Sequence, residues 1–194
     1  PVSFHGAVLS DLRARISSFL IADAASGDYR LNREVYTNAA LFELEMEQIF
    51  ENNWVFVGHE SQIAKPHDYL TTHIGRQPVI LSRTANGEIA CMLNTCAHRG
   101  AVVCRSKVGN RKTHSCGFHG WTYSSSGELR GIPGEEKGAY PPNLDKGKLG
   151  LKKVRAESYR GLIFASINPE VVPLSDYLGS STHFIDLMLD ASDS

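Results

Sequence analysis

Cys96-Ala97-His98 and Cys116-Gly117-Phe118-His119 are the two stretches that decide the fold of this 194-residue chain. In order they are Cys-x-His, a gap of seventeen residues, and Cys-x-x-His. Each stretch offers one thiolate and one imidazole within a few residues of backbone, as a metal-binding loop does. Glycine marks both stretches, at Gly100 in the first and at Gly120 in the second. The sequence therefore predicts two tight loops that hold one metal centre between them.

The order of residue types within the stretches distinguishes two kinds of metal centre. Two thiolates and two imidazoles suit a zinc ion, or a two-iron cluster in which histidines replace cysteines on one iron. A common zinc finger places its cysteines in one stretch and its histidines in the other, whereas here each stretch is mixed. Mixed stretches allow one thiolate from each loop to hold one iron and one imidazole from each loop to hold the other. We therefore predict a Rieske 2Fe–2S site, over zinc, with the ligands Cys96, His98, Cys116 and His119.

Composition narrows the class of protein. With 42% apolar and 21% charged residues, the chain has an ordinary globular composition. The net charge of −1 argues against a nucleic-acid partner or a membrane surface, and no apolar run approaches the length of a membrane span. The two remaining cysteines, Cys91 and Cys104, are expected to be small buried hydrophobic residues in strands. A reducing, cytoplasmic location fits this use of cysteine.

Helical patterns lie at the two ends of the chain. Apolar residues recur at helical spacing from Leu12 to Leu20, and a second helix is expected to begin near Asn38. A third pattern follows a proline-rich linker and runs from Asp176 to Asp190. The face of the second helix expected to be buried consists of Phe42, Met46, Ile49 and Phe50.

The middle of the chain reads as short strands broken by turns. Asn86-Gly87 and Ser126-Gly127 are hairpin turn signals, and residues 131–150 predict a long surface loop rich in proline and glycine. Runs of β-branched and aromatic residues favour strands. The expected strands are Trp54–Val57, Tyr69–Ile74, Val79–Ser82, Ile89–Leu93 and Leu162–Ala165.

Beyond the ligands, the sequence resembles the bacterial aromatic-ring-hydroxylating oxygenases over about residues 29 to 190. The resemblance begins with Cys-Ala-His-Arg-Gly followed by Cys-Gly-Phe-His-Gly-Trp. Large subunits that act on aromatic acids, such as the benzoate, anthranilate and halobenzoate dioxygenases, are the most similar. The further blocks that carry this resemblance are residues 44–50, 53–54, 58–61, 75–78 and 157–161.

The resemblance implies a mainly β fold, a Rieske iron–sulfur antiparallel β-sandwich domain with flanking N-terminal and C-terminal helices. We expect an N-terminal helical segment at 1–52 and the Rieske 2Fe-2S domain at 53–168. Residues 169–194 are expected to form a linker and helix that lead to a catalytic domain beyond this chain. The chain is thus interpreted as the N-terminal Rieske portion of a dioxygenase large (alpha) subunit.

The resemblance also implies a function and partners. Electrons pass from NAD(P)H through a flavin and iron–sulfur reductase to the cluster, and then to a mononuclear Fe(II) where O2 dihydroxylates an aromatic acid. The family implies trimers of large subunits, often with a small beta subunit. The mononuclear site is marked by Asp or Asn, two residues, His, four residues, His. His114 and His119 have that separation, but His119 is assigned to the cluster and Arg111 stands at the carboxylate position.

No catalytic residue is therefore assigned in this chain. His183, Asp186 and Asp190 are able to share one helix face, but a second histidine is absent and a solvated face is expected. We predict a chain that accepts electrons without hydroxylating. The alternative function is a free-standing Rieske-type ferredoxin, against which the helical patterns at both ends count.

The residues around the two loops predict a low reduction potential and a surface. Ala101 and Phe118 stand where high-potential relatives carry loop-bridging cysteines, and Trp121 stands where they carry a serine that bonds a sulfide. Fewer hydrogen bonds to sulfur favour the oxidised form, so we expect a weakly pH-dependent potential near about −150 mV. Basic residues near the loops form either a solvated surface or a docking patch for an acidic electron donor. They are Arg99, Arg105, Lys107, Arg111 and Lys112.

Overall fold

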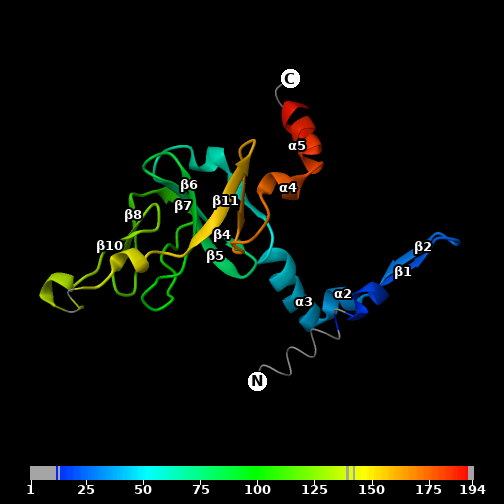
Figure 1. Cartoon of the computed structure of the whole chain (residues 1–194), viewed down its shortest axis with the longest axis horizontal. Coiled ribbons are helices and arrows are strands. Elements are labelled where there is room, and N and C mark those ends of the chain that lie inside the picture. Colours follow the sequence, from blue (N-terminus) through cyan, green and yellow to red (C-terminus); the bar gives the residue numbers. More distant parts are fainter. Residues whose placement is uncertain (1–11, 13, 139, 142, 192–194) are drawn as a thin grey trace. The chain divides into compact units, whose positions relative to one another are not determined.

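The computed structural model describes residues 12, 14–138, 140–141 and 143–191. The chain divides into two compact units, Pro1–Phe50 and Glu51–Ser194, whose elements are labelled in Figure 1. Within the described ranges, no helix is long and apolar enough to cross a membrane. The expected three-part division into 1–52, 53–168 and 169–194 stays a prediction.

The first unit contains a β-hairpin that the helical pattern did not predict. Strands β1 (Leu20–Asp23) and β2 (Asp28–Leu31) pair in antiparallel register. The Asp23 carboxylate accepts a hydrogen bond from the Ala25 N–H at 2.9 Å, and Gly27 has a φ of +72°. An aspartate that bonds its own turn and a glycine at positive φ favour reversal of the chain. The expectation of helix was wrong for residues 20–31 because this turn chemistry overrides the helical spacing.

The predicted start of the second helix at Asn38 is confirmed. The Asn38 side chain accepts hydrogen bonds from the N–H groups of Ala40 and Leu41, at 2.9 and 3.1 Å, and so caps α3. The helical elements of this unit are η1 (Ile16–Phe19), α2 (Glu34–Thr37), α3 (Ala39–Glu45) and the π-helical turn η2 (Met46–Phe50).

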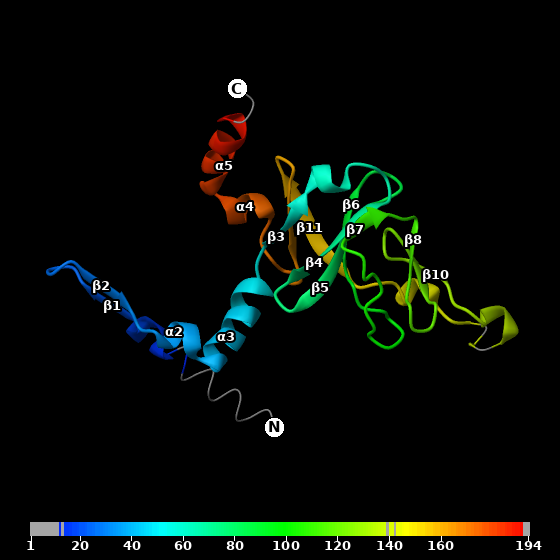
Figure 2. The ribbon, with the colours of Figure 1, turned by 180° about the vertical axis from the view of Figure 1, so that it is seen from behind.

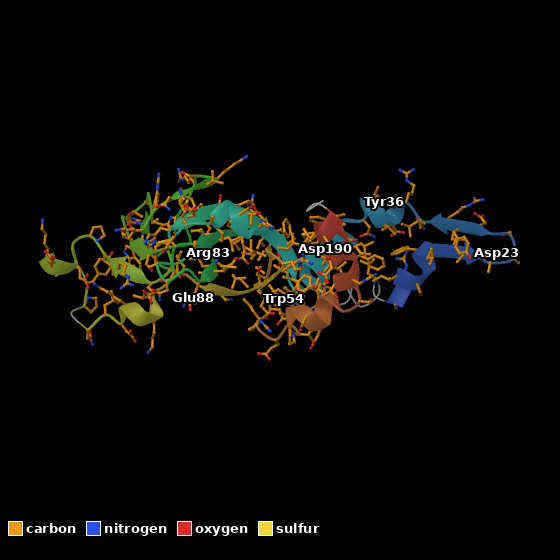
Figure 3. The ribbon with its side chains drawn as sticks, turned by 90° about the horizontal axis from the view of Figure 1, so that it is seen from above. Asp23, Tyr36, Trp54, Arg83, Glu88 and Asp190 are labelled. Carbon is orange, nitrogen blue, oxygen red and sulfur yellow. The ribbon has the colours of Figure 1, made fainter. Side chains whose placement is uncertain are left out.

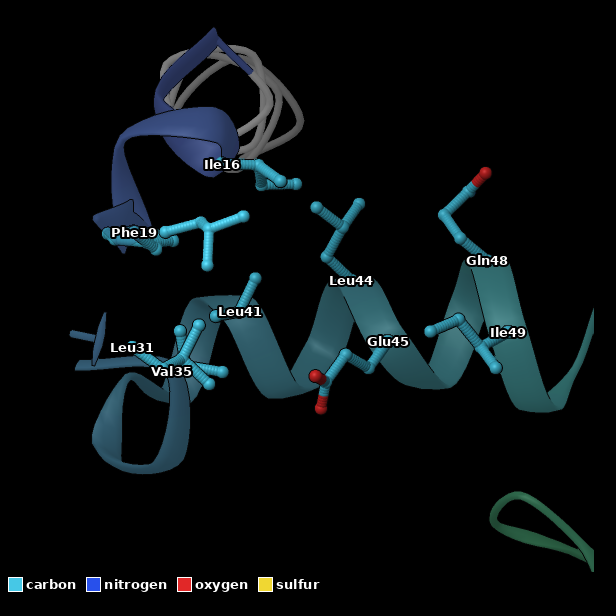
Figure 4. A pocket seen from close by; sticks show the side chains of 10 residues that line it. Ile16, Phe19, Leu31, Val35, Leu41, Leu44, Glu45, Gln48 and Ile49 are labelled. Carbon is cyan, nitrogen blue, oxygen red and sulfur yellow. The ribbon is translucent and has the colours of Figure 1, made fainter. Parts of the chain in front are cut away.

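The expected buried face of that helix was mostly wrong. Of its four residues, Met46 is buried, whereas Phe42, Ile49 and Phe50 are exposed. Leu41 and Leu44 are buried instead, in a cluster with Phe19. Figure 4 shows Leu41 and Leu44 projecting from α3 toward η1. The π-helical turn changes the residues per turn after Met46, so a face drawn at ideal helical spacing does not continue through it.

The second unit is built on an antiparallel seven-stranded sheet with the order β3-β12-β11-β6-β5-β4-β7. Four of the five predicted strands recur here within one or two residues, and the fifth, at Trp54, begins one residue later. Figures 1 and 2 show β4, β5, β6 and β11 as neighbours. The predicted mainly β, antiparallel fold class is confirmed. The strands are β3 (Val55–His59), β4 (Asp68–Ile74), β5 (Gln77–Arg83), β6 (Ile89–Leu93), β7 (Val108–Asn110), β11 (Lys153–Tyr159) and β12 (Leu162–Ser166).

A smaller three-stranded sheet carries the second metal stretch. Its strands β8 (Thr113–Ser115), β9 (Thr122–Ser124) and β10 (Leu129–Gly131) have the order β10-β9-β8. The stretch from Cys116 to His119 forms the connection between β8 and β9. Gly87 and Gly127 have φ values of +83° and +84°, as the two predicted hairpin turns require.

Side chains of the large sheet alternate between two cores. In β4, β5 and β6, Tyr69, Ile80 and Met92 belong to one hydrophobic cluster, whereas their neighbours Leu70 and Leu81 belong to another. Successive side chains of a strand point to opposite faces, so both faces of this sheet are buried. The first cluster also contains the cysteines of both metal stretches. One face of the sheet therefore forms the floor of the candidate site.

The helices of the second unit pack at its edges. The predicted helix from Asp176 to Asp190 is interrupted at Gly179, which has a φ of +47°. Trp54, labelled in Figure 3, is buried with Leu174, and its indole N–H donates to the Val172 carbonyl at 2.8 Å. The helical elements are η3 (Glu60–Ile63), η4 (Glu135–Lys137), η5 (Lys146–Lys148), α4 (Leu174–Leu178) and α5 (Ser181–Asp190).

The carboxylates of α5 are engaged with the β11–β12 hairpin. Asp186 accepts hydrogen bonds from the Tyr159 hydroxyl at 3.0 Å and from Arg160 at 3.2 Å. Asp190 accepts from Arg160 at 2.7 Å. The expectation of a merely solvated face was therefore incomplete, because these aspartates anchor the helix.

Candidate metal centre

The two metal stretches adopt the same backbone turn. In each, the cysteine N–H donates to the carbonyl five residues on, and a glycine four residues on donates its N–H to the cysteine carbonyl. These distances are 2.8 Å and 2.8 Å at Cys96, and 2.8 Å and 2.9 Å at Cys116. Gly100 and Gly120 have φ values of +74° and +71°, a conformation that favours glycine. The equal cysteine-to-glycine spacing is visible in the sequence, although the sequence analysis did not use it.

The turns bring the predicted ligands together in pairs. Cys96 and Cys116 are free thiols, each 3% exposed, in one hydrophobic cluster. The rings of His98 and His119 lie edge to face with their centroids 4.7 Å apart. His98 is half-buried and His119 is exposed. The sulfur side of the candidate site is thus enclosed, and its imidazole side faces the surface.

His98 shows that these residues fit a metal. Its Nδ1 atom is buried and has no hydrogen-bond partner among the described protein atoms. Burial lowers the pKa of His98, and the neighbouring His119 and Arg99 lower it further, so the ring is neutral at pH 7. Neutral imidazole is the form that binds metals, and an unpaired buried ring nitrogen is otherwise unfavourable. A metal bound at Nδ1 satisfies this atom.

Within the described part of the chain, no three His, Cys, Asp or Glu side chains are grouped so as to hold one ion. A two-iron cluster with two protein ligands on each iron does not require such a group.

Comparison with known families decides the class of centre. The Rieske 2Fe-2S domain family matches residues 53–155. This chain belongs to the Rieske family.

Dioxygenase subunits are among the relatives of this Rieske chain. It is 46% identical over 179 residues to the toluate 1,2-dioxygenase subunit alpha of Pseudomonas putida, covering 91% of this chain and 39% of the relative. It is 45% identical over 184 residues to the 2-halobenzoate 1,2-dioxygenase large subunit of Burkholderia cepacia, covering 93% and 39%. The predicted resemblance to large subunits of this kind is confirmed, and the chain spans about two-fifths of their length.

A solved structure agrees with this relationship. Naphthalene 1,2-dioxygenase from Rhodococcus sp., bound to indole, matches with a TM-score of 0.78 and 33% identity. The match covers 97% of this chain and 40% of that one.

Trp121 braces the two Rieske loops. Its indole, which belongs to the second loop, stacks on His98 of the first, with centroids 4.9 Å apart and planes at 12°. The indole N–H donates to the Tyr140 hydroxyl at 3.2 Å, and the side chain is buried. All four cysteines of the chain are free, so this stack connects the loops where high-potential relatives were expected to have a disulfide.

Tyr123 is a functional residue that the sequence analysis missed. Its hydroxyl lies 3.1 Å from the Cys96 sulfur and accepts a hydrogen bond from the Ala97 N–H at 3.1 Å. Because the oxygen accepts from Ala97, its hydrogen is free to donate to the sulfur. Burial raises the pKa of Tyr123, as does the neighbouring Cys96, so the phenol keeps its proton. A donor to a ligand sulfur raises the potential of an iron–sulfur cluster.

Strand alternation was the signal that could have found Tyr123. It lies two residues after Trp121, on the same inward face of β9. The prediction of a low potential counted the missing serine and cysteines but not this donor.

Other titratable residues near the loops are buried. His114, two residues before Cys116, is 2% exposed and packs edge to face on Tyr69 with ring centroids 4.8 Å apart. Cys91 is buried in β6, where desolvation raises its pKa to about 12. Cys104 is buried as expected, but it lies in a loop rather than a strand. His114 therefore sits in the hydrophobic interior and not in a second iron site of the described residues.

Proposed function

We propose that this chain is the electron-accepting Rieske portion of an aromatic-ring-hydroxylating dioxygenase large subunit. In the whole protein, electrons from an NAD(P)H-dependent reductase are relayed to a mononuclear non-haem iron that dihydroxylates an aromatic acid with O2. The observation that carries the proposal is the pair of matching turns, with buried thiols at Cys96 and Cys116 and facing imidazoles at His98 and His119. The toluate and 2-halobenzoate dioxygenase relatives support an aromatic-acid substrate.

We assign Cys96 and Cys116 to one iron, and His98, through Nδ1, and His119 to the other. When bound, the cluster supplies one-electron transfer. The enclosed thiols exclude water from the sulfur side, and the Tyr123 hydroxyl stabilises negative charge on Cys96. The exposed ring of His119 makes the imidazole side the closest approach for a redox partner.

Charge supports an acidic electron donor, which we take to be the flavin and iron–sulfur reductase. From residue 89 to residue 127 the sequence contains five Arg or Lys residues and no Asp or Glu. All five side chains are exposed, so their field reaches solvent and speeds encounter with a partner of opposite charge. These residues are Arg99, Arg105, Lys107, Arg111 and Lys112.

The whole protein is proposed to hold its mononuclear Fe(II) outside this chain and to assemble as a homotrimer or with a small beta subunit. We place it in the cytoplasm, where free thiols persist. The rival function, a free-standing ferredoxin, is disfavoured because identity to dioxygenase subunits covers more than nine-tenths of the chain, well beyond the Rieske match at 53–155.

The test supplies the cluster-loaded chain with NADH, a flavin and iron–sulfur reductase, O2 and benzoate or anthranilate. We expect the cluster to be reduced, with a rhombic EPR signal, and no diol to form. Stoichiometric diol, with more than two irons per chain, contradicts the proposal. A colourless protein containing one zinc contradicts the cluster itself.

The histidine ligands have a separate test. His98→Cys is expected to move the EPR signal toward that of an all-cysteine cluster, since thiolate then replaces imidazole on one iron. An unchanged signal in this variant contradicts the assignment of His98. Cys91→Ala is the matched control, because Cys91 lies on the opposite face of the sheet in the other hydrophobic cluster.

A further inference from the structure

A small pocket lies beside the second Rieske loop and has no role in the function proposed above. Its volume is about 250 Å³, and it opens between residues 103–106 and residues 111–117. A Cβ built on Gly117 would meet nothing within 4 Å, so there is room against the loop backbone itself. The polar residues and glycine that line the pocket are Arg105, Ser106, Arg111, His114, Ser115 and Gly117.

The charge of this pocket is wholly positive. Arg105 and Arg111 are exposed, and neither forms an ion pair within the described part of the chain. No carboxylate lines the pocket, and the sequence offers none between Glu88 and Glu128. The planar guanidinium group presents paired N–H donors that match the oxygens of a carboxylate or phosphate. Two unpaired guanidinium groups at one pocket are therefore suited to an anion with several oxygens.

His114 provides an independent reason to expect a ligand. Its ring lines the pocket and is 2% exposed, yet neither Nδ1 nor Nε2 has a hydrogen-bond partner among the described protein atoms. Leaving a buried polar group unpaired costs about 1–3 kcal/mol. A half-turn of the ring about χ2 exchanges its nitrogen and carbon positions at nearly constant volume. The ring can thus turn an N–H toward a ligand in the pocket while it keeps its packing against Tyr69.

We propose that this pocket binds a small oxyanion of the phosphate or carboxylate class. The guanidinium groups of Arg105 and Arg111 contact its oxygens, and the neutral His114 ring donates its N–H from below. Because Gly117 and Ser115 flank Cys116, the bound negative charge lies close to a ligand sulfur. Anion binding therefore disfavours the reduced cluster, so the anion lowers the midpoint potential.

The primary test is calorimetric titration of inorganic phosphate, and separately of acetate, into the cluster-loaded chain at constant ionic strength. Arg105→Gln/Arg111→Gln removes two pocket cations. Arg99→Gln/Lys107→Gln is the matched control, because it removes the same charge from the same acid-free stretch at residues that do not line the pocket. Loss of charge-assisted hydrogen bonds predicts a Kd that rises by about tenfold or more in the pocket variant and by about twofold or less in the control.

His114→Phe keeps a ring of similar shape and removes the N–H, and it is expected to weaken binding several-fold. The midpoint potential is a second readout, independent of heat, and should fall with phosphate in the parent chain but not in Arg105→Gln/Arg111→Gln. Saturable binding of either anion, lost selectively in the pocket variant, supports the site and identifies the oxyanion class. No saturable binding of phosphate or acetate overturns it, and so does equal weakening by both double variants, which would indicate diffuse attraction alone. These outcomes do not depend on whether the whole protein is a dioxygenase.

Discussion

The first and second Rieske loops share one backbone turn but place their histidines in different surroundings. His98 stands two residues after its cysteine, is half-buried, and stacks on Trp121. His119 stands three residues after its cysteine and is exposed, next to Phe118, which is 69% exposed. A shift of one residue within the same turn is therefore enough to direct one imidazole against the protein and the other toward solvent. We infer that the first loop adjusts the cluster, while the second presents it to partners.

The largest effect is expected from the cysteines, where the two loops should be equivalent. Cys96→Ser and Cys116→Ser each remove one of the two thiolates assigned to one iron, so each variant should lose nearly all of its cluster. Iron and acid-labile sulfide per chain, together with visible absorbance, measure this. Cys104→Ala, at a buried cysteine outside both turns, should keep the cluster. Retention of a full cluster by either serine variant would refute the pairing.

Aromatic residues should break the equivalence of the loops. Trp121→Ala removes a buried side chain that stacks on His98, and large core truncations of this kind cost about 3–5 kcal/mol in the free energy of unfolding. Phe118→Ala, at an exposed side chain of the second loop, should change it by about 0.5 kcal/mol or less. Urea unfolding of the loaded protein gives both values. Similar losses in the two variants would remove the argument that Trp121 is the brace.

The loop glycines provide a comparison in which only the surroundings differ. Gly100 and Gly120 have nearly the same positive φ, but a Cβ at Gly120 would lie 2.7 Å from Pro133 Cγ, whereas the nearest atom to one at Gly100 is 4.0 Å away. Gly100→Ala should cost about 1–2 kcal/mol from backbone strain alone. Gly120→Ala should cost about 1–3 kcal/mol more, because the added methyl group overpacks the loop.

Unfolding free energies of the two alanine variants test this difference. In a double-mutant cycle, Pro133→Ala should recover much of the excess cost at Gly120. A cycle with no coupling, or equal losses at the two glycines, contradicts the steric explanation.

The smallest effect concerns the one sulfur to which a side chain donates. Tyr123→Phe removes the hydroxyl at the Cys96 sulfur, and the loss of about 1 kcal/mol of stabilisation of the reduced state corresponds to a fall of about 40 mV in the one-electron midpoint potential. Because the raised pKa of Tyr123 keeps the phenol protonated, the fall should be the same at pH 6 and pH 8. Direct electrochemistry measures it.

Tyr140→Phe is the control for that measurement, since its hydroxyl bonds the Trp121 indole and not a sulfur. An unchanged or higher potential in Tyr123→Phe would show that the phenol does not donate to Cys96.

Local chemistry explains where the sequence predicted the fold well. The strand from Ile89 to Leu93 and the turns at Gly87 and Gly127 follow from residue types that act within a few positions of backbone. The predicted helix through Leu20 was wrong for a related reason, because the Asp23 turn signal is equally local and was outweighed by apolar spacing. The buried face of α3 was beyond such reasoning, since a π-helical turn and the position of Phe19 decide it.

The sequence by itself determined the two mixed Cys/His stretches, their glycines and the acid-free, basic character of the chain around them, because these properties depend on residue identity and spacing. Only the tertiary structure decided that Trp121 stacks on His98, that Tyr123 reaches Cys96 across 27 positions, and that His114 is left unpaired beside Arg105 and Arg111. Such contacts join residues far apart in sequence or on different elements. Their geometry is set by how the two sheets and the loops pack, and spacing along the chain does not encode it.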